Sequence, residues 1–346
     1  MNSKPTDTNL TPNFSKPRFE LNPVTPLSDR FSYSRQQAWQ LLQCFLPSAY
    51  QLNEQTLPQE YFWPWRSHQI HVDHYPRPSA AAKIILVHGV GTNGRQMSLI
   101  LGHPLAEAGY ETIALDFPGY GLSQNPDHKA IVYDDWVAVL SDFIAHEQSK
   151  DERPVFLFGL SAGGMLCLHS VLQQAQVKGI IGLSFLDQRY ISVKKGCMRF
   201  SQLSALGLPL LQLCAQTPLK YLRLPMRLVS KMYALSNDPK ALQCMLQDRS
   251  SAGNAMSLQF LHSYLNYVPQ ADLAQLQIPV LMAQPELDRW TPLALSLPAL
   301  QQLSQPYDLV ILPQGGHYPT EEAALDELKH SSLSFIEKHL CTQSSI

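Results

Sequence analysis

A serine between two glycines is the residue of this chain best placed for nucleophilic chemistry. Ser161 is the centre of a Gly-x-Ser-x-Gly pattern with Gly159 and Gly163, and the apolar run 155–158 leads into it. A helical stretch follows at once, so Ser161 would lie on a sharp strand-to-helix turn with its hydroxyl above a sheet. Side chains at the two glycine positions would strike the neighbouring backbone. The pattern therefore predicts a nucleophile at Ser161.

An acid and a base follow the serine along the chain, each at the end of a predicted strand. Asp288 comes after the apolar run 278–283, and His317 comes after the run 309–312 and two glycines. A serine hydroxyl needs a base within hydrogen-bond reach to become a good nucleophile. A histidine can take that proton, and a carboxylate fixes its tautomer. The order Ser161, Asp288, His317 thus fits a catalytic triad.

The elements that must position these residues alternate between strand and helix. Six apolar runs are predicted strands, and helical stretches separate most of them: residues 83–87, 112–115, 155–158, 179–186, 278–283 and 309–312. A closing amphipathic helix is predicted over 321–339. This alternation predicts an α/β fold with a parallel sheet and helices on both of its faces.

Residues 188–277 interrupt that alternation. They show no clear strand, are helical in character, contain several prolines and are rich in Leu and Met, which predicts an inserted helical subdomain. Its apolar residues could form a core of their own, line an apolar pocket, or do both. Its basic residues most simply mark a solvated face, with attraction to a membrane surface as the alternative: Lys194, Lys195, Arg199, Lys220, Arg223, Arg227 and Lys231.

The chain divides into four predicted segments. Residues 1–60 form an N-terminal extension, which we expect to be disordered over its first thirty residues. A short helix over 34–46 would pack on the main domain or cover a pocket mouth. Residues 61–187 and 278–346 form the two halves of the core, and residues 188–277 form the inserted cap.

A competing pattern lies earlier in the chain. The strand 83–87 ends in a loop where Gly89, Gly91 and Gly94 fit Gly-x-Gly-x-x-Gly, and the next strand ends in Asp116. A dinucleotide-binding unit has this layout, so an NAD(P)-dependent oxidoreductase is an alternative. Three observations weigh against it. A histidine precedes the glycines, a glycine-rich loop follows the acidic residue, and the serine turn and the residues after 280 would have no role.

A group of histidines is close to a metal-binding pattern. His68, His71, Asp73 and His74 approach the His-x-His-x-Asp-His spacing of dinuclear sites, but the spacing is off by one residue and no second cluster of matching kind follows. We therefore expect surface residues on a polar strand. The sequence implies no metal and no cofactor.

Composition limits the class of protein. The 346 residues are 45% hydrophobic and 16% charged, which allows a substantial core, and the formal net charge of −2 gives no reason to expect nucleic acid. Six scattered cysteines indicate free, buried thiols in a reducing compartment. Neither a signal peptide nor an apolar run long enough to span a membrane is evident. We expect a soluble, cytoplasmic protein.

Five stretches, taken together and in order, resemble the α/β-hydrolase superfamily in its capped, esterase- and lipase-like branch. They lie at 88–91, 116–123, 159–163, 288–292 and 316–317, and the resemblance covers residues 83–340. It implies Ser161 as nucleophile, His317 as base and Asp288 as the orienting acid. It also implies an oxyanion hole from the backbone N–H groups of Val90 and Ala162, and such donors contribute about 10²–10³ in rate each.

The sequence departs from this family pattern in two places. The oxyanion loop is His-Gly-x-Gly rather than His-Gly-Gly-Gly, and the nucleophile is not the Asp of epoxide hydrolases and haloalkane dehalogenases, whose reactions are therefore disfavoured. A second acid is also available, because Asp187 ends the strand before the insertion. We favour Asp288, which forms Asp-x-x-x-Pro after the penultimate strand. Asp187 would then cap a helix or pair with Arg189.

The functional hypothesis is a serine hydrolase that cleaves carboxylic esters through an acyl-enzyme. The Leu/Met-rich insertion favours a small-molecule ester with an apolar acyl or alcohol part. The same triad could serve an acyltransferase, a thioesterase or a carbon–carbon bond hydrolase. A non-catalytic, ligand-binding protein with this fold is a further alternative. We expect neither a nucleic-acid partner nor stable membrane insertion.

Overall fold

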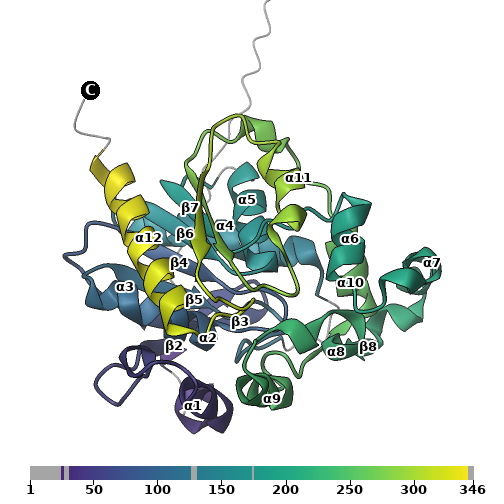
Figure 1. The fold of residues 1–346 in the computed structure, drawn as a ribbon, viewed down its shortest axis with the longest axis horizontal. Coiled ribbons are helices and arrows are strands. Elements are labelled where there is room, and N and C mark those ends of the chain that lie inside the picture. Colours follow the sequence, from purple (N-terminus) through teal and green to yellow (C-terminus); the bar gives the residue numbers. More distant parts are fainter. Residues whose placement is uncertain (1–24, 27–30, 126–130, 174, 342–346) are drawn as a thin grey trace, which may run out of the picture.

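A computed structural model describes residues 25–26, 31–125, 131–173 and 175–341. Within these residues, nine strands form one sheet in the order β1-β2-β3-β5-β4-β6-β7-β10-β11 (Figure 1). The strands are β1 (Thr25–Pro26), β2 (Gln59–Trp65), β3 (His68–Tyr75), β4 (Lys83–Val87), β5 (Glu111–Leu115), β6 (Val155–Gly159), β7 (Gly179–Gly182), β10 (Val280–Pro285) and β11 (Asp308–Leu312). Six neighbouring strands of this sheet are parallel: β5, β4, β6, β7, β10 and β11. Strands β1, β2 and β3 extend the sheet beyond β5 in antiparallel pairs. The predicted α/β fold is confirmed.

Helices cover both faces of the sheet. α4 (Tyr133–Lys150) and α5 (Ala162–Leu172) pack together on one face, and α3 (His103–Glu107) and α12 (Glu322–Cys341) on the other (Figure 1). The short α11 (Leu297–Leu300) lies between β10 and β11 in the chain. Every residue of β4 and β6 is buried, because the sheet is covered on both sides. This explains why these strands are almost wholly apolar.

The residues between β7 and β10 gather into a mainly helical cap beside the sheet, at the right of Figure 1. Its helices are α6 (Ile191–Cys197), α7 (Ser204–Ala215), α8 (Met226–Val229), α9 (Pro239–Gln247) and α10 (Leu258–Leu265). The expectation that this stretch contains no strand is wrong, because β8 (Arg223–Pro225) pairs antiparallel with β9 (Ala255–Ser257). Strands of three residues are too short to show the alternation that predicts a strand.

The N-terminal extension is part of the folded protein where the structure describes it. Tyr33, Trp39 and Leu42 are buried, and α1 (Gln37–Gln43) packs against α9. The guanidinium of Arg95, in α2 (Gly94–Met97), lies 4.8 Å and 4.6 Å from the ring centres of Tyr33 and Trp39. The predicted helix is shorter than 34–46, and it packs against the rest of the protein. The predicted disorder of residues 1–30 falls outside the described residues, except for 25–26.

The polar strand β3 is buried where the sequence predicts a surface. His71 and Asp73 are 0% and 1% exposed. Arg95 donates to Asp73 at 2.6 Å and to Glu60 at 2.7 Å, and His71 lies 3.0 Å from Asp116. Burial alone lowers the pKa of His71, but the carboxylates of Asp116 and Glu60 outweigh burial and raise the pKa to about 9. These ion pairs offset the cost of placing charges in the interior.

The structure can be compared with two expectations drawn from composition, one on the cysteines and one on membrane-spanning segments. All six cysteines are free, but only Cys167 is fully buried, and Cys44 and Cys341 are exposed, so the prediction of buried thiols is wrong for most of them. Among the described residues, no helix has both the length and the apolar character needed to cross a membrane.

Candidate active site

Ser161 lies on the tight turn between β6 and α5. Its backbone adopts φ 56° and ψ −125°, a conformation that side-chain-bearing residues rarely take. A Cβ atom at Gly163 would lie 2.4 Å from the Val87 carbonyl oxygen, and one at Gly159 would lie 2.5 Å from the Gly163 carbonyl carbon. Both contacts are too close for any side chain, so the glycines of the pattern permit the turn that carries the serine.

Asp288 and His317 meet at the same edge of the sheet. They follow β10 and β11, which are neighbouring parallel strands, so their loops leave the sheet side by side. The Nδ1 atom of His317 lies 2.9 Å from Oδ2 of Asp288, and both side chains are buried. A carboxylate can only accept a hydrogen bond, so Nδ1 carries the proton and Nε2 keeps a free lone pair.

Thr291 completes the surroundings of Asp288 and was not among the residues predicted from the sequence. The N–H groups of Trp290 and Thr291 both donate to Asp288 Oδ1 at 2.8 Å, and the Thr291 hydroxyl donates to Oδ2 at 2.7 Å. Burial alone raises the pKa of Asp288, but His317 and these hydrogen bonds outweigh burial and lower the pKa to about 2. The carboxylate is therefore ionised at neutral pH. The Asp-x-x-Thr spacing, typical of a side chain that caps its own turn, is the signal that could have revealed Thr291.

His317 and Ser161 are not joined by a hydrogen bond in this structure. His317 Nε2 is buried and has no hydrogen-bond partner among the described residues, Ser161 included. The indole of Trp290 packs against the imidazole with ring centres 4.7 Å apart, and Trp290 and Ser161 line the same cavity. The structure thus joins Asp288 to His317 and leaves the basic nitrogen available to a nearby proton donor.

The loop that carries Val90 packs directly against the serine turn. A Cβ atom at Gly89 would lie 2.6 Å from the Leu160 carbonyl oxygen and 3.1 Å from the Ala162 nitrogen. The His88 ring holds this loop, because Nδ1–H donates to the Gly89 carbonyl at 2.8 Å and Nε2 accepts from the Phe117 N–H at 2.9 Å. Burial lowers the pKa of His88, which keeps the ring neutral for both bonds.

The two predicted oxyanion donors border the cavity. Val90 and Ala162 line it together with Ser161. Neither backbone N–H donates a hydrogen bond to another residue of the described chain. Two unused amides beside a serine hydroxyl can stabilise an oxyanion that forms on the attacked carbonyl.

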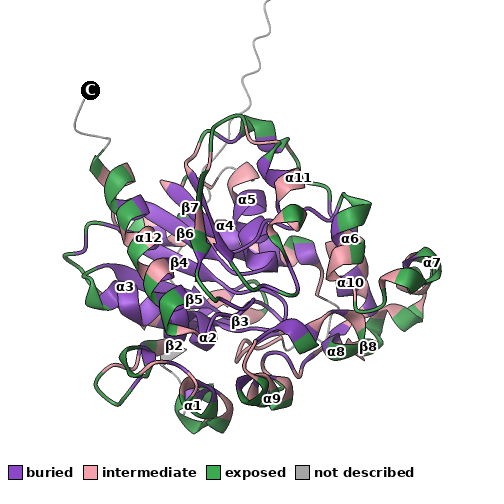
Figure 2. Cartoon of the chain, in the orientation of Figure 1, coloured by how far each residue is buried: buried purple, intermediate pink, exposed green. Residues whose placement is uncertain are grey.

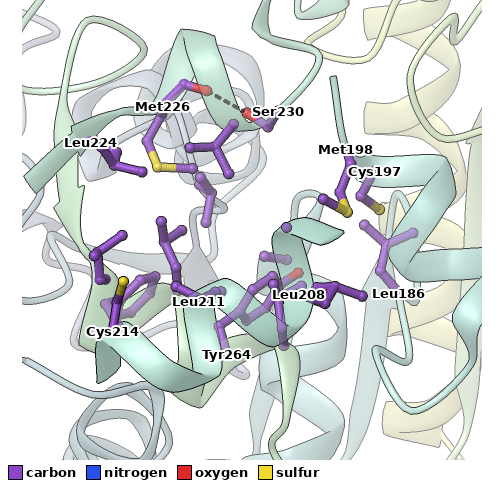
Figure 3. A pocket seen from close by; sticks show the side chains of 18 of the residues that line it. Leu186, Cys197, Met198, Leu208, Leu211, Cys214, Leu224, Met226, Ser230 and Tyr264 are labelled. Atoms are coloured by element: carbon purple, nitrogen blue, oxygen red, sulfur yellow. Dashed lines mark hydrogen bonds between the residues drawn. The ribbon is translucent and has the colours of Figure 1, made fainter. Parts of the chain in front are cut away.

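A cavity of about 430 Å³ opens above Ser161 and is lined almost entirely by apolar side chains. The cap supplies most of them, including Leu208 and Leu211 of α7 and Met226 of α8, which point into the cavity in Figure 3. No charged side chain of the described residues lines it. The sequence left open whether the apolar residues of the insertion face a pocket, and a number of them do.

Asp187, the alternative acid, is bound elsewhere. Its carboxylate accepts hydrogen bonds from Arg189 at 2.7 Å and 3.0 Å and from the Gln302 side chain at 3.2 Å. Among the described residues, the carboxylate that pairs with His317 is that of Asp288, and no hydrogen bond or ion pair joins Asp187 to His317. Asp187 therefore pairs with Arg189, which is one of the two structural roles that the sequence suggests for it.

Asp116, the acidic residue of the dinucleotide alternative, is fully buried. It accepts hydrogen bonds from the backbone N–H groups of Gly94 and Leu122, at 2.7 Å and 2.8 Å, and from the Tyr33 hydroxyl at 2.9 Å. No oxygen of this carboxylate is free to bind a ribose. The glycine loop before it packs on the serine turn instead of surrounding a phosphate site, so the geometry does not favour a nucleotide cofactor.

Glu60, His71 and Asp73 are the described residues that come closest to a metal site, with ligand atoms within 4.8 Å of one another. Arg95 already binds both carboxylates. The raised pKa of His71 keeps its ring protonated at neutral pH, and a protonated imidazole has no lone pair for a metal. The cluster therefore fits an internal ion-pair network and does not fit a cation.

Several solved structures share this fold. A soluble variant of monoglyceride lipase from Saccharomyces cerevisiae, in complex with a substrate analog, is 16% identical, with 84% of this chain and 98% of that chain covered and a TM-score of 0.65. Monoacylglycerol lipase from Paleococcus ferrophilus is 17% identical, with 78% and 99% covered and a TM-score of 0.57. Est1E from Butyrivibrio proteoclasticus, bound to ferulic acid, is 13% identical, with 81% and 99% covered and a TM-score of 0.53.

Comparison at the level of sequence gives a family as well as a fold. No curated protein sequence matches the chain. The family model described as "Alpha/beta hydrolase family" matches residues 84–329, which include the serine turn, Asp288 and His317. The chain therefore belongs to the alpha/beta hydrolase family.

Proposed function

We propose that this protein is a serine hydrolase that cleaves carboxylic esters with an apolar acyl or alcohol part. One observation carries the proposal. An ionised Asp288 holds His317 with its Nε2 lone pair unused, at the same edge of the sheet as a serine on a strained turn that faces an apolar cavity. Two solved structures of the same fold are lipases for monoglycerides, which supports an apolar ester as substrate.

The reaction would proceed through an acyl-enzyme. His317 Nε2 takes the proton from Ser161 Oγ as that oxygen forms a bond to the ester carbonyl carbon. The carbonyl electrons move to the oxygen, which accepts hydrogen bonds from the Val90 and Ala162 amides. When the carbonyl re-forms, the bond to the alcohol breaks and His317 gives its proton to the leaving oxygen. Water then attacks the acyl-enzyme by the same route, releasing the acid and restoring Ser161.

Asp288 and Thr291 would keep the imidazole in one tautomer throughout. The carboxylate stabilises the imidazolium that forms in each step, and Thr291 fixes the carboxylate. The uncharged lining of the cavity excludes charged acyl groups, because an unpaired charge is costly to bury there.

A fluorophosphonate probe and p-nitrophenyl esters of graded acyl length test this proposal. We expect the probe to label the unmodified protein, which should also turn over the esters, and Ser161→Ala should do neither. The control variant Ser332→Ala, at a buried serine of α12, should keep both activities. Labelling or turnover that persists in Ser161→Ala would contradict the proposal, as would a folded, unmodified protein that does neither.

A further inference from the structure

The outer side of the cap is apolar where it meets solvent. On α7, Leu206, Leu210 and Leu213 are 77%, 59% and 62% exposed, and Leu203, just before the helix, is 59% exposed. Their spacing of three and four residues places them on one side of the helix. α7 contains no charged residue and lies at the outer edge of the cap, as Figures 1 and 2 show. A surface helix with this pattern lacks the polar outer face that solvent usually demands.

Positively charged residues flank this helix in the sequence. Residues 188–237 contain eight Lys and Arg and neither Asp nor Glu, although the whole chain has a formal net charge of −2. Arg189 is paired with Asp187, and the other seven have no acidic residue near them in sequence. Lys195, Arg199 and Arg227 are exposed. Arg199 donates to the Arg227 backbone carbonyl at 2.6 Å, so these two residues lie side by side.

The exposed apolar surface continues into the cavity above Ser161. Leu210 and Leu222 line that cavity and are still 59% and 53% exposed. Leu208 and Leu211 of the same helix point inward in Figure 3. α7 therefore presents apolar side chains both to the cavity and to solvent, and the wall of the cavity reaches the molecular surface there.

We propose that this surface of the cap binds an anionic phospholipid bilayer. Leu203, Leu206, Leu210 and Leu213 would enter the boundary between headgroups and acyl chains, and the exposed basic residues of the cap would face the anionic headgroups. An apolar surface alone would equally suit a protein partner or a second copy of the chain. Flanking charge of one sign favours the anionic surface over a symmetric pairing of this face with a second copy, because two identical basic faces would repel each other.

Lipid binding by this surface does not depend on the proposed hydrolysis. Lipid binding and hydrolysis would be linked at Leu210 and Leu222, which line the cavity and are also exposed. An apolar substrate could pass there from the bilayer into the cavity without crossing water. Binding is therefore measured with the full chain carrying Ser161→Ala, so that no vesicle lipid can be cleaved. Hydrolysis of soluble esters by the unmodified protein tests the proposed function separately.

Co-sedimentation with vesicles tests the proposal directly. We expect affinity for vesicles of phosphatidylcholine and phosphatidylglycerol at about 7:3 to exceed that for pure phosphatidylcholine by about tenfold or more, and to fall at high salt. Lys195→Gln with Arg227→Gln should weaken binding to the mixed vesicles about tenfold. Arg66→Gln with Arg77→Gln removes the same charge from the sheet side and should leave binding unchanged.

A second pair of variants tests the apolar contribution. Leu206→Gln with Leu213→Gln should weaken binding by about tenfold. Leu41→Gln with Leu309→Gln alters two leucines that are 55% and 46% exposed on α1 and β11, and should have no effect. Absence of binding to the mixed vesicles, or equal losses in cap and control variants, would overturn the proposal. So would a dimer in sedimentation velocity that the Leu206/Leu213 variant dissociates, together with no vesicle binding.

Discussion

The sheet and the cap differ in where they keep their charged groups. Charged groups in the strands of the sheet and in the loops that follow them are buried and paired. Asp288, after β10, is bound by His317 and Thr291, and Asp73 of β3 is bound by Arg95. In the cap, Lys195 and Arg227 are exposed to solvent. A buried charge is stable only when its partners are complete, so each buried pair allows few arrangements of the backbone around it. The sheet can therefore hold reacting groups at fixed positions.

Apolar side chains show the opposite distribution. All five residues of β4 and of β6 are buried, whereas several leucines of α7 are more than half exposed. The cap contributes most of the apolar side chains that line the cavity, and some of them are also exposed to solvent. The residues proposed to react and most of the apolar wall of the cavity thus belong to different parts of the chain, and the following substitutions test this division.

The largest expected effect is at the carboxylate beside the sheet. Asp288→Asn keeps the shape of the side chain but removes the charge that stabilises the imidazolium and sets its tautomer. We expect kcat to fall by about 10⁴-fold on a p-nitrophenyl ester. Asp187→Asn is the matched control, because Asp187 is the alternative acid that the sequence offers and its carboxylate is also buried. This variant should change kcat less than about tenfold. The reverse ranking of the two variants would assign the acid to Asp187.

The positions of Ser161, Asp288 and His317 could be predicted because each follows an apolar run that becomes a parallel strand. Parallel strands end at a common edge, so residues far apart in sequence arrive together. The role of Thr291 could not be predicted in this way. Its hydroxyl reaches Asp288 and lies 3.0 Å from His317 only because of the turn after β10, which side-chain hydrogen bonds close.

Two errors have a common physical origin. The surface position expected for His71 ignored Glu60, Arg95 and Asp116, which are distant in sequence and make its burial possible. The strands β8 and β9, which the sequence did not predict, likewise depend on pairing between distant segments. Periodicity describes a segment by itself, so it cannot report a polar or short element that a distant partner stabilises.

His71 offers a test of the buried charges that is independent of catalysis. Its pKa of about 9 in the folded protein lies above the ordinary value of 6.5. Its contribution to stability is therefore complete below about pH 6.5 and is lost as the pH rises towards about 9. We expect His71→Gln to lower the free energy of unfolding by up to about 3 kcal/mol more at pH 6 than above pH 9.

Urea unfolding at a series of pH values measures this difference. Four groups act on the His71 ring or on its carboxylate partners: Glu60, Asp73, Arg95 and Asp116. His330→Gln, at an exposed histidine of α12, serves as control and should leave the pH dependence of unfolding as it is in the unmodified protein. An unchanged pH dependence in His71→Gln would mean that the buried network is not charged as we describe.

The smallest effect is expected in the cap, where one side chain should change selectivity without changing the chemistry. Leu208 lines the cavity from α7. The bulk of Leu208→Trp should lower kcat/KM for long-chain p-nitrophenyl esters about tenfold relative to short-chain ones, because losing a few buried methylenes costs about 1–3 kcal/mol. Gln212→Trp, on the exposed side of the same helix, adds the same bulk outside the cavity and should keep the chain-length profile. If both variants reduced all esters equally, the cap would be supporting the reacting groups themselves, and the division between a sheet that fixes geometry and a cap that selects substrate would fail.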